Sequence, residues 1–382
     1  MNGSFRIARV GGIDIRLHFT FLLVLPIIAF GFARAFASVH EAALAADVPP
    51  ERLHGSPLFW GALVAVALFA SVLLHELAHA FVAVRKGGKV RDITLLMIGG
   101  VSNLTELPRE PKHEALMAIV GPIASVGLAA IFFVLHLALS GTQLYALRFA
   151  FFYLAGLNLV LGLFNLVPAF PMDGGRILRG LLATRMGPVR ATQVAATLGK
   201  VFAVLFALVG IWTFNFFLLL IGFFIYLGAE AESGQVLLKS VLGAVRVTDL
   251  VKPSPLPIEA SATVEDAAER MVRDEQLALL VSRGDGALGV VRLEEVERVP
   301  SERRPAVSVW EIVKEAPSVP PTANLWDAFR LMTEKGFPLV VVRDGSNLVG
   351  ILEREDVLRS LRLQGLQGRP PSAGWIRRER TV

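Results

Sequence analysis

The sequence predicts a polytopic α-helical membrane domain of six spans with a small membrane-associated β-sheet, followed by a soluble α/β domain. Hydrophobic residues make up 54% of the 382 residues, above the roughly 45–50% of ordinary soluble domains. Of the first 240 residues 30 are charged, against 41 of the last 142. This contrast is expected when lipid solvates the first part and water the second. In addition, a pattern of helix and strands occurs twice after residue 246.

Charge and cysteine content exclude several function classes. The formal net charge of +5 divides into +6 for residues 1–240 and −1 for residues 241–382. The basic excess belongs to the membrane part, where basic loops orient the spans, and it gives no support to a nucleic-acid partner. Because the chain has no cysteine, it has no disulfide framework, thiolate zinc site or cysteine nucleophile.

Four apolar stretches are long enough to cross the roughly 30 Å of hydrocarbon in a lipid bilayer, and two more apolar stretches follow them, which gives six predicted spans. Arg and Lys are frequent between spans two and three and between spans four and five, whereas loop 38–56 has only Arg52 and loop 140–144 has no basic residue. The positive-inside rule therefore predicts a multi-pass protein of the cell membrane with both termini in the cytoplasm. The predicted spans are 19–37, 57–84, 115–139, 145–167, 197–213 and 214–228.

Two segments on the predicted cytoplasmic side alternate in the manner of β-strands. Residues 90–104 form a pair of β-type runs around Gly99-Gly100, and residues 6–17 have Gly11-Gly12 as a turn signal. We expect two hairpins that together form a small sheet at the cytoplasmic mouth of the domain. The alternative is that both segments are connectors without a functional role.

The C-terminal part repeats one pattern of a helix followed by two strands. The two predicted helices, 263–273 and 325–334, lie about 60 residues apart. Because one such unit would not bury its sheet alone, we expect the two units to pair. The predicted strands are 278–282, 288–292, 339–343 and 348–352. The predicted domains are 1–240 and 246–361, with a disordered tail at 362–382.

The clearest chemical motif is His75-Glu76-Leu77-Ala78-His79 inside the second span. Residues four apart lie on the same helix face, so both imidazoles are able to bind one metal ion. Glu76 lies beside them and would polarise the metal-bound water. Ionisable residues inside a span are costly, which favours a functional role over chance.

The third metal ligand is predicted at the end of the fourth span. Two prolines end the helix there, and Gly174-Gly175 permit a tight turn that directs the Asp173 carboxylate toward the histidines. His75 lies about 15 Å of helix before the basic end of its span, so Asp173 is on the correct side of the membrane. With His79 they would bind one Zn²⁺ per chain and leave a position open for water.

The motifs HELAH, inside a span, and NLVPAFPMDGGR, about a hundred residues later, together resemble the site-2 protease family of intramembrane zinc metalloproteases. The resemblance covers about residues 1–235 and includes Gly121-Pro122 in the third span. It implies that Glu76 is the catalytic base and that His75, His79 and Asp173 bind zinc. It also implies that the substrate is the transmembrane segment of another protein. Since no PDZ-like insertion interrupts the spans, the chain resembles members with a C-terminal regulatory domain.

Two asparagines of the fourth span are further candidates for the site. Asn165 begins the second motif, and we favour a role in binding the substrate or a reaction intermediate. Asn158 is interpreted as a hydrogen-bonding residue between helices, with contact to an unwound substrate as the alternative.

The C-terminal repeat resembles a tandem of cystathionine-β-synthase (CBS) domains over about residues 246–361. Residues 247–251, 289–295 and 350–356 carry the resemblance. In nucleotide-binding members a Ser or Thr follows the strand, and an Asp three residues later binds ribose. Asp356 is the only match here, because both hydroxyl positions hold charged residues. We therefore favour a dimerisation or docking module that binds no nucleotide, with an adenine nucleotide at Asp356 as the alternative.

Two classes of function fit these motifs. The first is a zinc endopeptidase that cleaves the transmembrane segment of a membrane protein in regulated intramembrane proteolysis, with the predicted sheet capturing the substrate as an added strand. The second is a metal-binding or transport protein that is gated by the CBS-like pair. Glu76 discriminates between them, because a transporter does not need a non-ligand carboxylate beside the first histidine. An inactive scaffold is a third class, although every expected catalytic position is filled.

Overall fold

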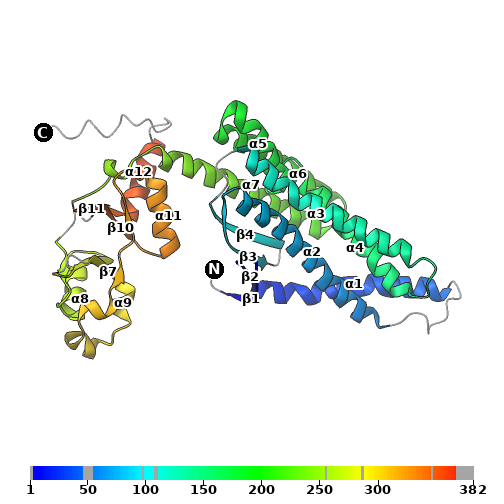
Figure 1. Ribbon diagram of the computed structural model, residues 1–382, viewed down its shortest axis with the longest axis horizontal. Coiled ribbons are helices and arrows are strands. Elements are labelled where there is room, and N and C mark those ends of the chain that lie inside the picture. Colours follow the sequence, from blue (N-terminus) through cyan, green and yellow to red (C-terminus); the bar gives the residue numbers. More distant parts are fainter. Residues whose placement is uncertain are drawn as a thin grey trace. The chain divides into compact units, whose positions relative to one another are not determined.

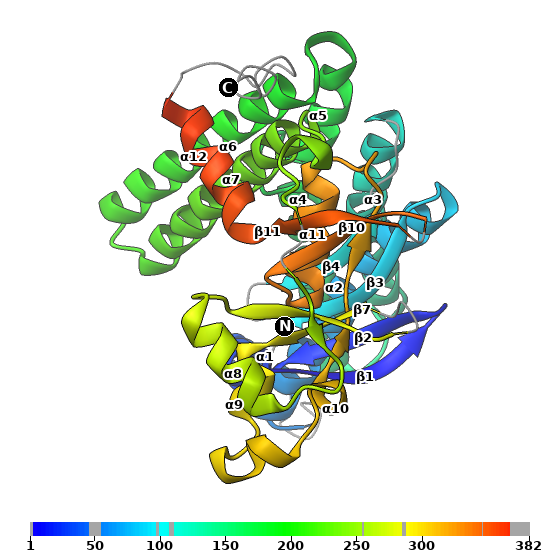
Figure 2. The ribbon, with the colours of Figure 1, turned by 90° about the vertical axis from the view of Figure 1, so that its left-hand side faces the viewer.

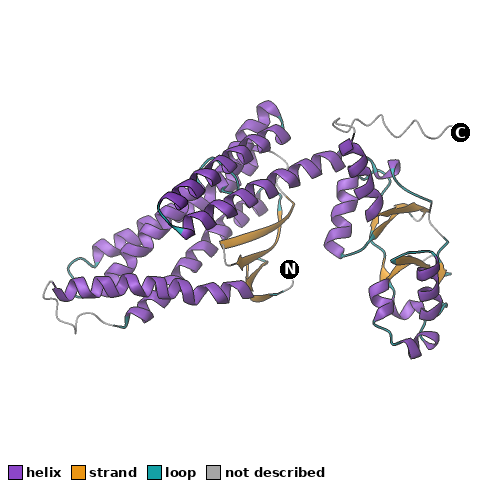
Figure 3. Cartoon of the chain, turned by 180° about the vertical axis from the view of Figure 1, so that it is seen from behind, coloured by secondary structure: helices purple, strands orange, loops and turns teal. Residues whose placement is uncertain are grey.

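The computed structural model describes residues 3–45, 55–96, 99–106, 111–253, 256–284, 288–345 and 347–366. The chain divides into two compact units, Met1–Val236 and Leu237–Val382. Figure 3 shows the first unit as long helices with one small sheet, and the second as a mixture of strands and helices. The predicted fold class, helical membrane domain and soluble α/β domain, is confirmed.

Six helices of the first unit are long and apolar enough to cross a membrane, which confirms the predicted spans (Figure 1). The last two helices extend beyond the apolar stretches 197–213 and 214–228. Beyond the last apolar stretch, Glu230 of α7 is ion-paired with Lys200 of α6. The six helices are α1 (Phe19–Ala45), α2 (Pro57–Arg85), α3 (Pro111–Ala138), α4 (Tyr145–Asn165), α6 (Pro188–Trp212) and α7 (Phe216–Gly243).

A four-stranded sheet lies beside these helices, as predicted from the two alternating segments. Its order is β1-β2-β3-β4, with β2 and β3 parallel and the outer pairs antiparallel. Gly11 and Gly12 form the first turn with φ of 56° and 87°, conformations that suit glycine. The strands are β1 (Ser4–Val10), β2 (Ile13–His18), β3 (Lys89–Leu96) and β4 (Gly99–Glu106).

The sheet packs one face against the membrane helices. Ile13 of β2 and Ile93 of β3 are buried with Ala80 of α2 in one hydrophobic cluster. This packing places β3 and β4 beside the helix that bears the HELAH motif. The expected turn at Gly99-Gly100 is wrong, because both glycines pair with β3 inside β4.

A shorter helix, α5 (Asp173–Met186), connects α4 to α6 and packs against α3 and α6. Small residues let the membrane helices approach closely. A Cβ at Gly61 of α2 would lie 2.3 Å from the Ala29 carbonyl oxygen of α1. A Cβ at Gly162 of α4 would lie 2.9 Å from Val126 of α3. Helix α3 also contacts both α2 and α5, and these three helices carry the candidate site.

The second unit contains the predicted repeat, and the predicted helices and strands are found within one or two residues of their expected ends. The first copy has β5 (Ile258–Glu259), α8 (Val264–Arg273), β6 (Ala278–Ser282), β7 (Leu288–Arg292) and α9 (Leu293–Glu297). A 3-10 turn (Ser301–Ala306) and α10 (Val309–Ile312) lead to the second copy. That copy has β8 (Lys314–Glu315), β9 (Ser318–Val319), α11 (Leu325–Lys335), β10 (Leu339–Asp344), β11 (Asn347–Glu353) and α12 (Arg354–Leu366).

The two copies pair through their sheets (Figure 2). The first sheet has the order β5-β6-β7-β8 and the second β11-β10-β9, so β8 completes the sheet of the first copy. Leu280 of β6 and Leu339 of β10 are buried in one cluster between the copies. Because α12 runs to Leu366, the tail expected at 362–382 begins with helix, and its remainder lies outside the described residues.

Candidate metal centre

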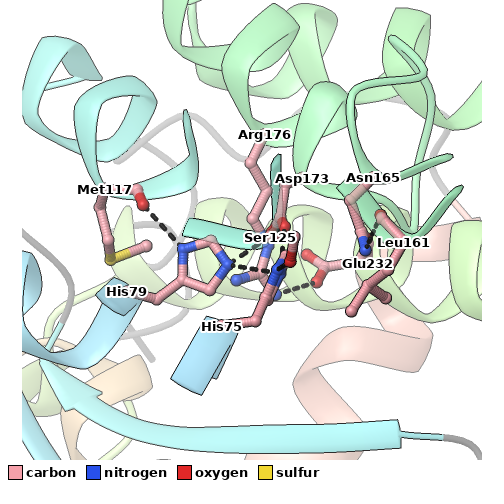
Figure 4. Close-up of polar contacts among 9 residues, drawn as sticks. All are labelled: His75, His79, Met117, Ser125, Leu161, Asn165, Asp173, Arg176 and Glu232. Carbon is pink, nitrogen blue, oxygen red and sulfur yellow. Dashed lines mark hydrogen bonds and ion pairs between the residues drawn. The ribbon is translucent and has the colours of Figure 1, made fainter. Parts of the chain in front are cut away.

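The histidines of the HELAH motif lie one turn apart on α2 and point at the same place (Figure 4). The two Nε2 atoms are 3.1 Å apart, and the residues are only 4% and 7% exposed. Asp173 Oδ2 lies 3.1 Å from Nε2 of His75 and 3.1 Å from Nε2 of His79. The fold therefore brings together the three predicted ligands. Two of them lie on α2, and the third, Asp173, follows His75 by 98 residues in the chain.

Asp173 reaches this place because it is the first residue of α5. The segment between α4 and α5 folds back, so that its backbone packs directly against the first turn of α5. A Cβ at Gly174 would lie 2.2 Å from the Val167 carbonyl oxygen, and one at Gly175 would lie 2.6 Å from the backbone of Ala169. Gly174 and Gly175 are therefore required for close backbone packing in the first turn of α5, and the expected tight turn at these positions is wrong.

Both imidazoles are oriented through their second ring nitrogen. His79 Nδ1 lies 2.7 Å from the Met117 carbonyl oxygen of α3, so it donates a hydrogen bond and its Nε2 keeps a lone pair for a metal. His75 Nδ1 lies 2.8 Å from the Ser125 hydroxyl of α3. Such partners fix the tautomer and ring orientation of metal-binding histidines.

The donor set fits a zinc ion. Two imidazole nitrogens and one carboxylate oxygen are a set typical of catalytic zinc, and bond lengths of about 2.0–2.1 Å separate tetrahedral ligand atoms by roughly 3.3 Å. The observed separations of 3.1 Å agree with this value. In the part of the chain that the structure describes, these three residues are the one group of His, Asp or Glu placed to bind a metal.

Two glycines lie directly against this group. A Cβ at Gly121 of α3 would lie 2.2 Å from His79 Nε2 and 2.7 Å from His75 Nε2. A Cβ at Gly100 of β4 would lie 2.5 Å from Glu76 Cγ. The backbone of the edge strand β4 therefore lies directly against the Glu76 side chain, and the backbone of α3 lies directly against the two imidazole rings.

Sequence comparisons identify the family. The profile of peptidase family M50 matches residues 63–151 and 142–209. The chain is similar to a zinc metalloprotease of Methanocaldococcus jannaschii, 30% identical over 371 residues that span 96% of this chain and 98% of that protein. The chain belongs to peptidase family M50. It is a multi-pass intramembrane zinc metalloprotease of the site-2 protease type, as the two motifs predicted.

A second curated relative is similar along nearly the whole chain. Rip3 of Mycobacterium tuberculosis is 34% identical over 379 residues, which span 94% of this chain and 93% of that protein. The solved structure of a site-2 protease from Methanocaldococcus jannaschii is 34% identical, covers 60% of this chain and 95% of its own, and has a TM-score of 0.43. CBS-domain profiles match residues 247–302 and 309–363, which confirms the tandem predicted there.

The remaining predicted site residues lie outside this group. Asn158 is fully buried in α4, and its amide donates to the Leu154 carbonyl of the same helix. Its Oδ1 has no hydrogen-bond partner in the described part of the chain, so the expected bond between helices is not found there. Asn165 ends α4 and donates to the Leu161 carbonyl (Figure 4). Asp356 lies in α12 of the second unit.

Sequence reasoning missed the groups that orient the ligands. Ser125 lies in an apolar span, where the sequence does not distinguish a hydrogen-bonding serine from a small residue that only allows close helix packing. Met117 acts through its backbone carbonyl, for which a side-chain pattern gives no signal. Sequence reasoning also gave no signal for the ion pairs of Glu114 with Arg179 and of Glu232 with Arg176, because acidic residues near span ends are expected in solvent.

Proposed function

We propose that this protease cleaves the transmembrane segment of another membrane protein, with zinc bound by His75, His79 and Asp173 and with Glu76 as the general base. The observation that carries the proposal is the 3.1 Å triangle of ligand atoms, buried between helices beside Glu76. Regulated intramembrane proteolysis is the physiological setting that we propose, because a soluble CBS pair follows the membrane domain in the same chain.

Each residue has one task in this mechanism. Bound zinc supplies Lewis-acid chemistry, which acidifies a water molecule and polarises the scissile carbonyl. Glu76 accepts the proton of the attacking water and returns it to the leaving amine. Ser125 and the Met117 carbonyl hold the imidazoles in place, and the helices around the site exclude bulk water.

The substrate must unwind before hydrolysis, because carbonyl groups in a transmembrane helix already accept hydrogen bonds. The edge strand β4 supports a route for this step. Within the described residues β4 pairs on one side only, with β3, and Gly100 brings its backbone against Glu76. We propose that an unwound substrate segment adds to β4 as a further strand and so reaches the base. Asn165, at the end of α4, would bind this segment or an intermediate, and Asn158 Oδ1 is a buried acceptor for it.

Both termini are proposed to lie in the cytoplasm. Of the four arginines that follow α4 in α5 and the first turn of α6, Arg185 and Arg190 are exposed, whereas Arg176 and Arg179 form ion pairs inside the domain. The exposed pair, with Arg85 at the end of α2, still supports the positive-inside orientation.

We propose that the CBS pair is a docking or dimerisation module, through which the chain forms a homo-oligomer. Lys252 Nζ lies 2.6 Å from Asp356 Oδ1 and 3.5 Å from Glu353 Oε2, so the carboxylate that would bind ribose already has a cation. The alternative, an adenine nucleotide, is favoured by one observation. Asp356 Oδ2 is buried without a hydrogen-bond partner in the described part of the chain.

Cleavage assays on single-span substrates test the proposed function. Purified wild-type protein should cleave some members of a panel of single-span proteins, and Glu76→Gln should lose at least about a hundredfold in rate, because the amide keeps the shape and cannot accept a proton. Glu76→Gln should keep its zinc. Cleavage near the wild-type rate in this variant would refute the base and would favour metal transport.

Elemental analysis tests the ligands separately. His79→Ala and Asp173→Ala should each lose most of the single zinc ion per chain, since two protein ligands bind zinc far more weakly than three. Full zinc content in either variant would contradict the ligand assignment, whatever the result of the cleavage assay.

A further inference from the structure

A second cluster of charged side chains lies beside the metal centre and joins three helices. Arg176 and Arg179 lie on α5, Glu114 on α3 and Glu232 on α7. Arg176 Nη2 donates to Glu232 Oε1 at 3.2 Å, and Arg179 Nη1 lies 3.7 Å from Glu232 Oε2. Arg179 Nη2 also donates to Glu114. Figure 4 shows the bond between Arg176 and Glu232 next to Asp173.

The two arginines hold the end of α5 that bears the metal ligand. Arg176 follows Asp173 by three residues and lies on the same side of α5, and Arg179 follows Arg176 by a further three residues. The side chain of Arg179 is 9% exposed and that of Glu232 is 22% exposed. Two cations and two carboxylates balance in charge, and removal of one partner leaves a buried charge without compensation.

Glu232 is in addition part of a helix shared by both units of the chain. The boundary between the units falls after Val236, inside α7. Leu238 and Leu242, further along α7, belong to the hydrophobic core of the second CBS repeat together with Leu325 of α11. Glu232 and Leu242 are separated by about 15 Å of uninterrupted helix. One helix therefore ends in the repeat core and is ion-paired to the helix of Asp173.

We propose that Glu232 is a positioning residue, which fixes the Asp173 end of α5 to α7 and thereby links the metal centre to the CBS pair. The inference rests on the proposed role of Asp173 as a zinc ligand. A displacement of α7 by the repeats would move the partner of both arginines and, through α5, the third ligand.

Glu230 provides a matched control for this role. It lies two residues from Glu232 on α7 and is also ion-paired, but its partner is Lys200 of α6 and its side chain is 60% exposed. In the full-length protein, Glu232→Gln should lower the affinity for zinc in competition with a chelator by about tenfold or more. The kcat should fall with KM for the substrate unchanged, because Glu232 is ion-paired to Arg176 and Arg179 and acts on the metal centre through α5. Glu230→Gln should match wild type in each measurement.

Two further variants keep the test decisive. Glu232→Asp keeps the negative charge opposite the two arginines. This variant should therefore bind zinc more tightly than Glu232→Gln, and its fold should be less destabilised. Zinc affinity of both variants within about twofold of wild type would overturn the proposal. Zinc bound in full by Asp173→Ala would instead contradict the proposed ligand set, so the two failures are distinguishable.

A double-mutant cycle tests the link to the repeats. Leu242→Ala creates a cavity in the repeat core on α7 itself, and Leu352→Ala creates one in the same core on β11. Leu242→Ala should lower zinc affinity in the wild-type background and add little to Glu232→Gln. Leu352→Ala should change zinc affinity less than Leu242→Ala. Additive effects of Leu242→Ala and Glu232→Gln, or no effect of Leu242→Ala, would overturn the link.

Discussion

His75 and His79 present the same ring nitrogen to the metal centre, but different kinds of groups hold them there. The partner of His79 is a backbone carbonyl, at 2.7 Å, whose position is set by the helix geometry of α3. The partner of His75 is a side-chain hydroxyl, at 2.8 Å, that belongs to the fully buried Ser125. Only the second contact can be removed by a single substitution.

We expect Ser125→Ala to weaken zinc binding by about ten- to a hundredfold, because the His75 ring loses the partner that fixes its orientation. A competition titration with a chelator measures the change. Ser71 is the control, since its buried hydroxyl donates to the Ala67 carbonyl of its own helix. Equal zinc affinities of Ser125→Ala and Ser71→Ala would show that the hydroxyl does not position His75.

A buried carboxylate in the C-terminal unit gives a pH-dependent stability. Burial by itself would raise the pKa of Glu295, but hydrogen bonds from Arg292 and Lys314 outweigh burial and lower this pKa to about 2, from an ordinary 4.5. Arg292 Nε lies 2.8 Å from Glu295 Oε2, and Lys314 Nζ lies 3.2 Å from Oε1. The charged form is thus favoured in the folded state.

The free energy of unfolding of the 237–382 unit should therefore decrease as the pH falls from about 4.5 to about 2. A group with a lowered folded pKa stabilises the fold above its unfolded pKa and loses this contribution as it becomes protonated, here about 3 kcal/mol in total. Denaturant unfolding at a series of pH values measures the slope. Glu295→Gln should flatten it, whereas Glu294→Gln, whose side chain is 67% exposed, should leave it unchanged. Equal slopes in all three proteins would contradict the prediction.

At the scale of the helices, the site depends on how closely α3 approaches α2. Gly121 faces both histidines, and a Cβ there would lie 2.2 Å from His79 Nε2. Gly127 lies two turns further along the same helix, with nothing within 4 Å of its Cβ position. Substitution of Gly121 therefore tests the close approach of α3 to α2, and substitution of Gly127 is the control for replacing a glycine in the same helix.

Gly121→Ala is expected to abolish most zinc binding and cleavage, because the methyl group would occupy the space next to the ligand nitrogens. Gly127→Ala should keep both, with stability unchanged or higher by about 0.5–1 kcal/mol. Zinc content by elemental analysis and thermal unfolding of the detergent-solubilised proteins measure these effects. Full zinc content in Gly121→Ala would mean that α3 moves freely relative to α2.

At the scale of the whole molecule, the two CBS repeats exchange ion pairs. Lys252, at the start of the first repeat, pairs with Asp356 at the end of the second, and Lys314 of the second repeat pairs with Glu295 of the first. The backbones beside these lysines are also paired, Lys252 with Ile351 and Lys314 with Val290. The carboxylates at the two nucleotide-site positions thus hold the repeats together.

We therefore expect ATP, ADP and AMP to leave the melting temperature of the C-terminal unit unchanged. A nucleotide bound at Asp356 would have to displace Lys252 from this carboxylate. In addition, the negative charge of the nearby Glu353 would repel the phosphate groups. Ligand at a hundred times Kd would stabilise the fold by about 2.7 kcal/mol, which a thermal-shift titration detects easily. A saturable rise in melting temperature that Asp356→Ala removes would show that the unit binds nucleotide.

The sequence by itself determined the features that depend on near neighbours in the chain. Apolar length predicted the six spans, spacing of four residues placed His75 and His79 on one helix face, and the repeat of about 60 residues predicted the CBS pair. These patterns are legible because one helix or strand imposes a fixed period on its own residues. Two prolines and an aspartate at the end of the fourth span also sufficed to predict the third ligand.

The tertiary structure alone decided which distant groups complete the site. Ser125, the Met117 carbonyl and Glu232 follow no period, and they lie 38 to 56 residues from the groups they contact. The same holds for Gly174-Gly175, which a sequence pattern assigns to a turn and the fold uses for close packing. Buried polar groups take whatever partner the packing of helices brings within hydrogen-bond distance, so their pairing is a property of the assembled helices and is absent from any single segment.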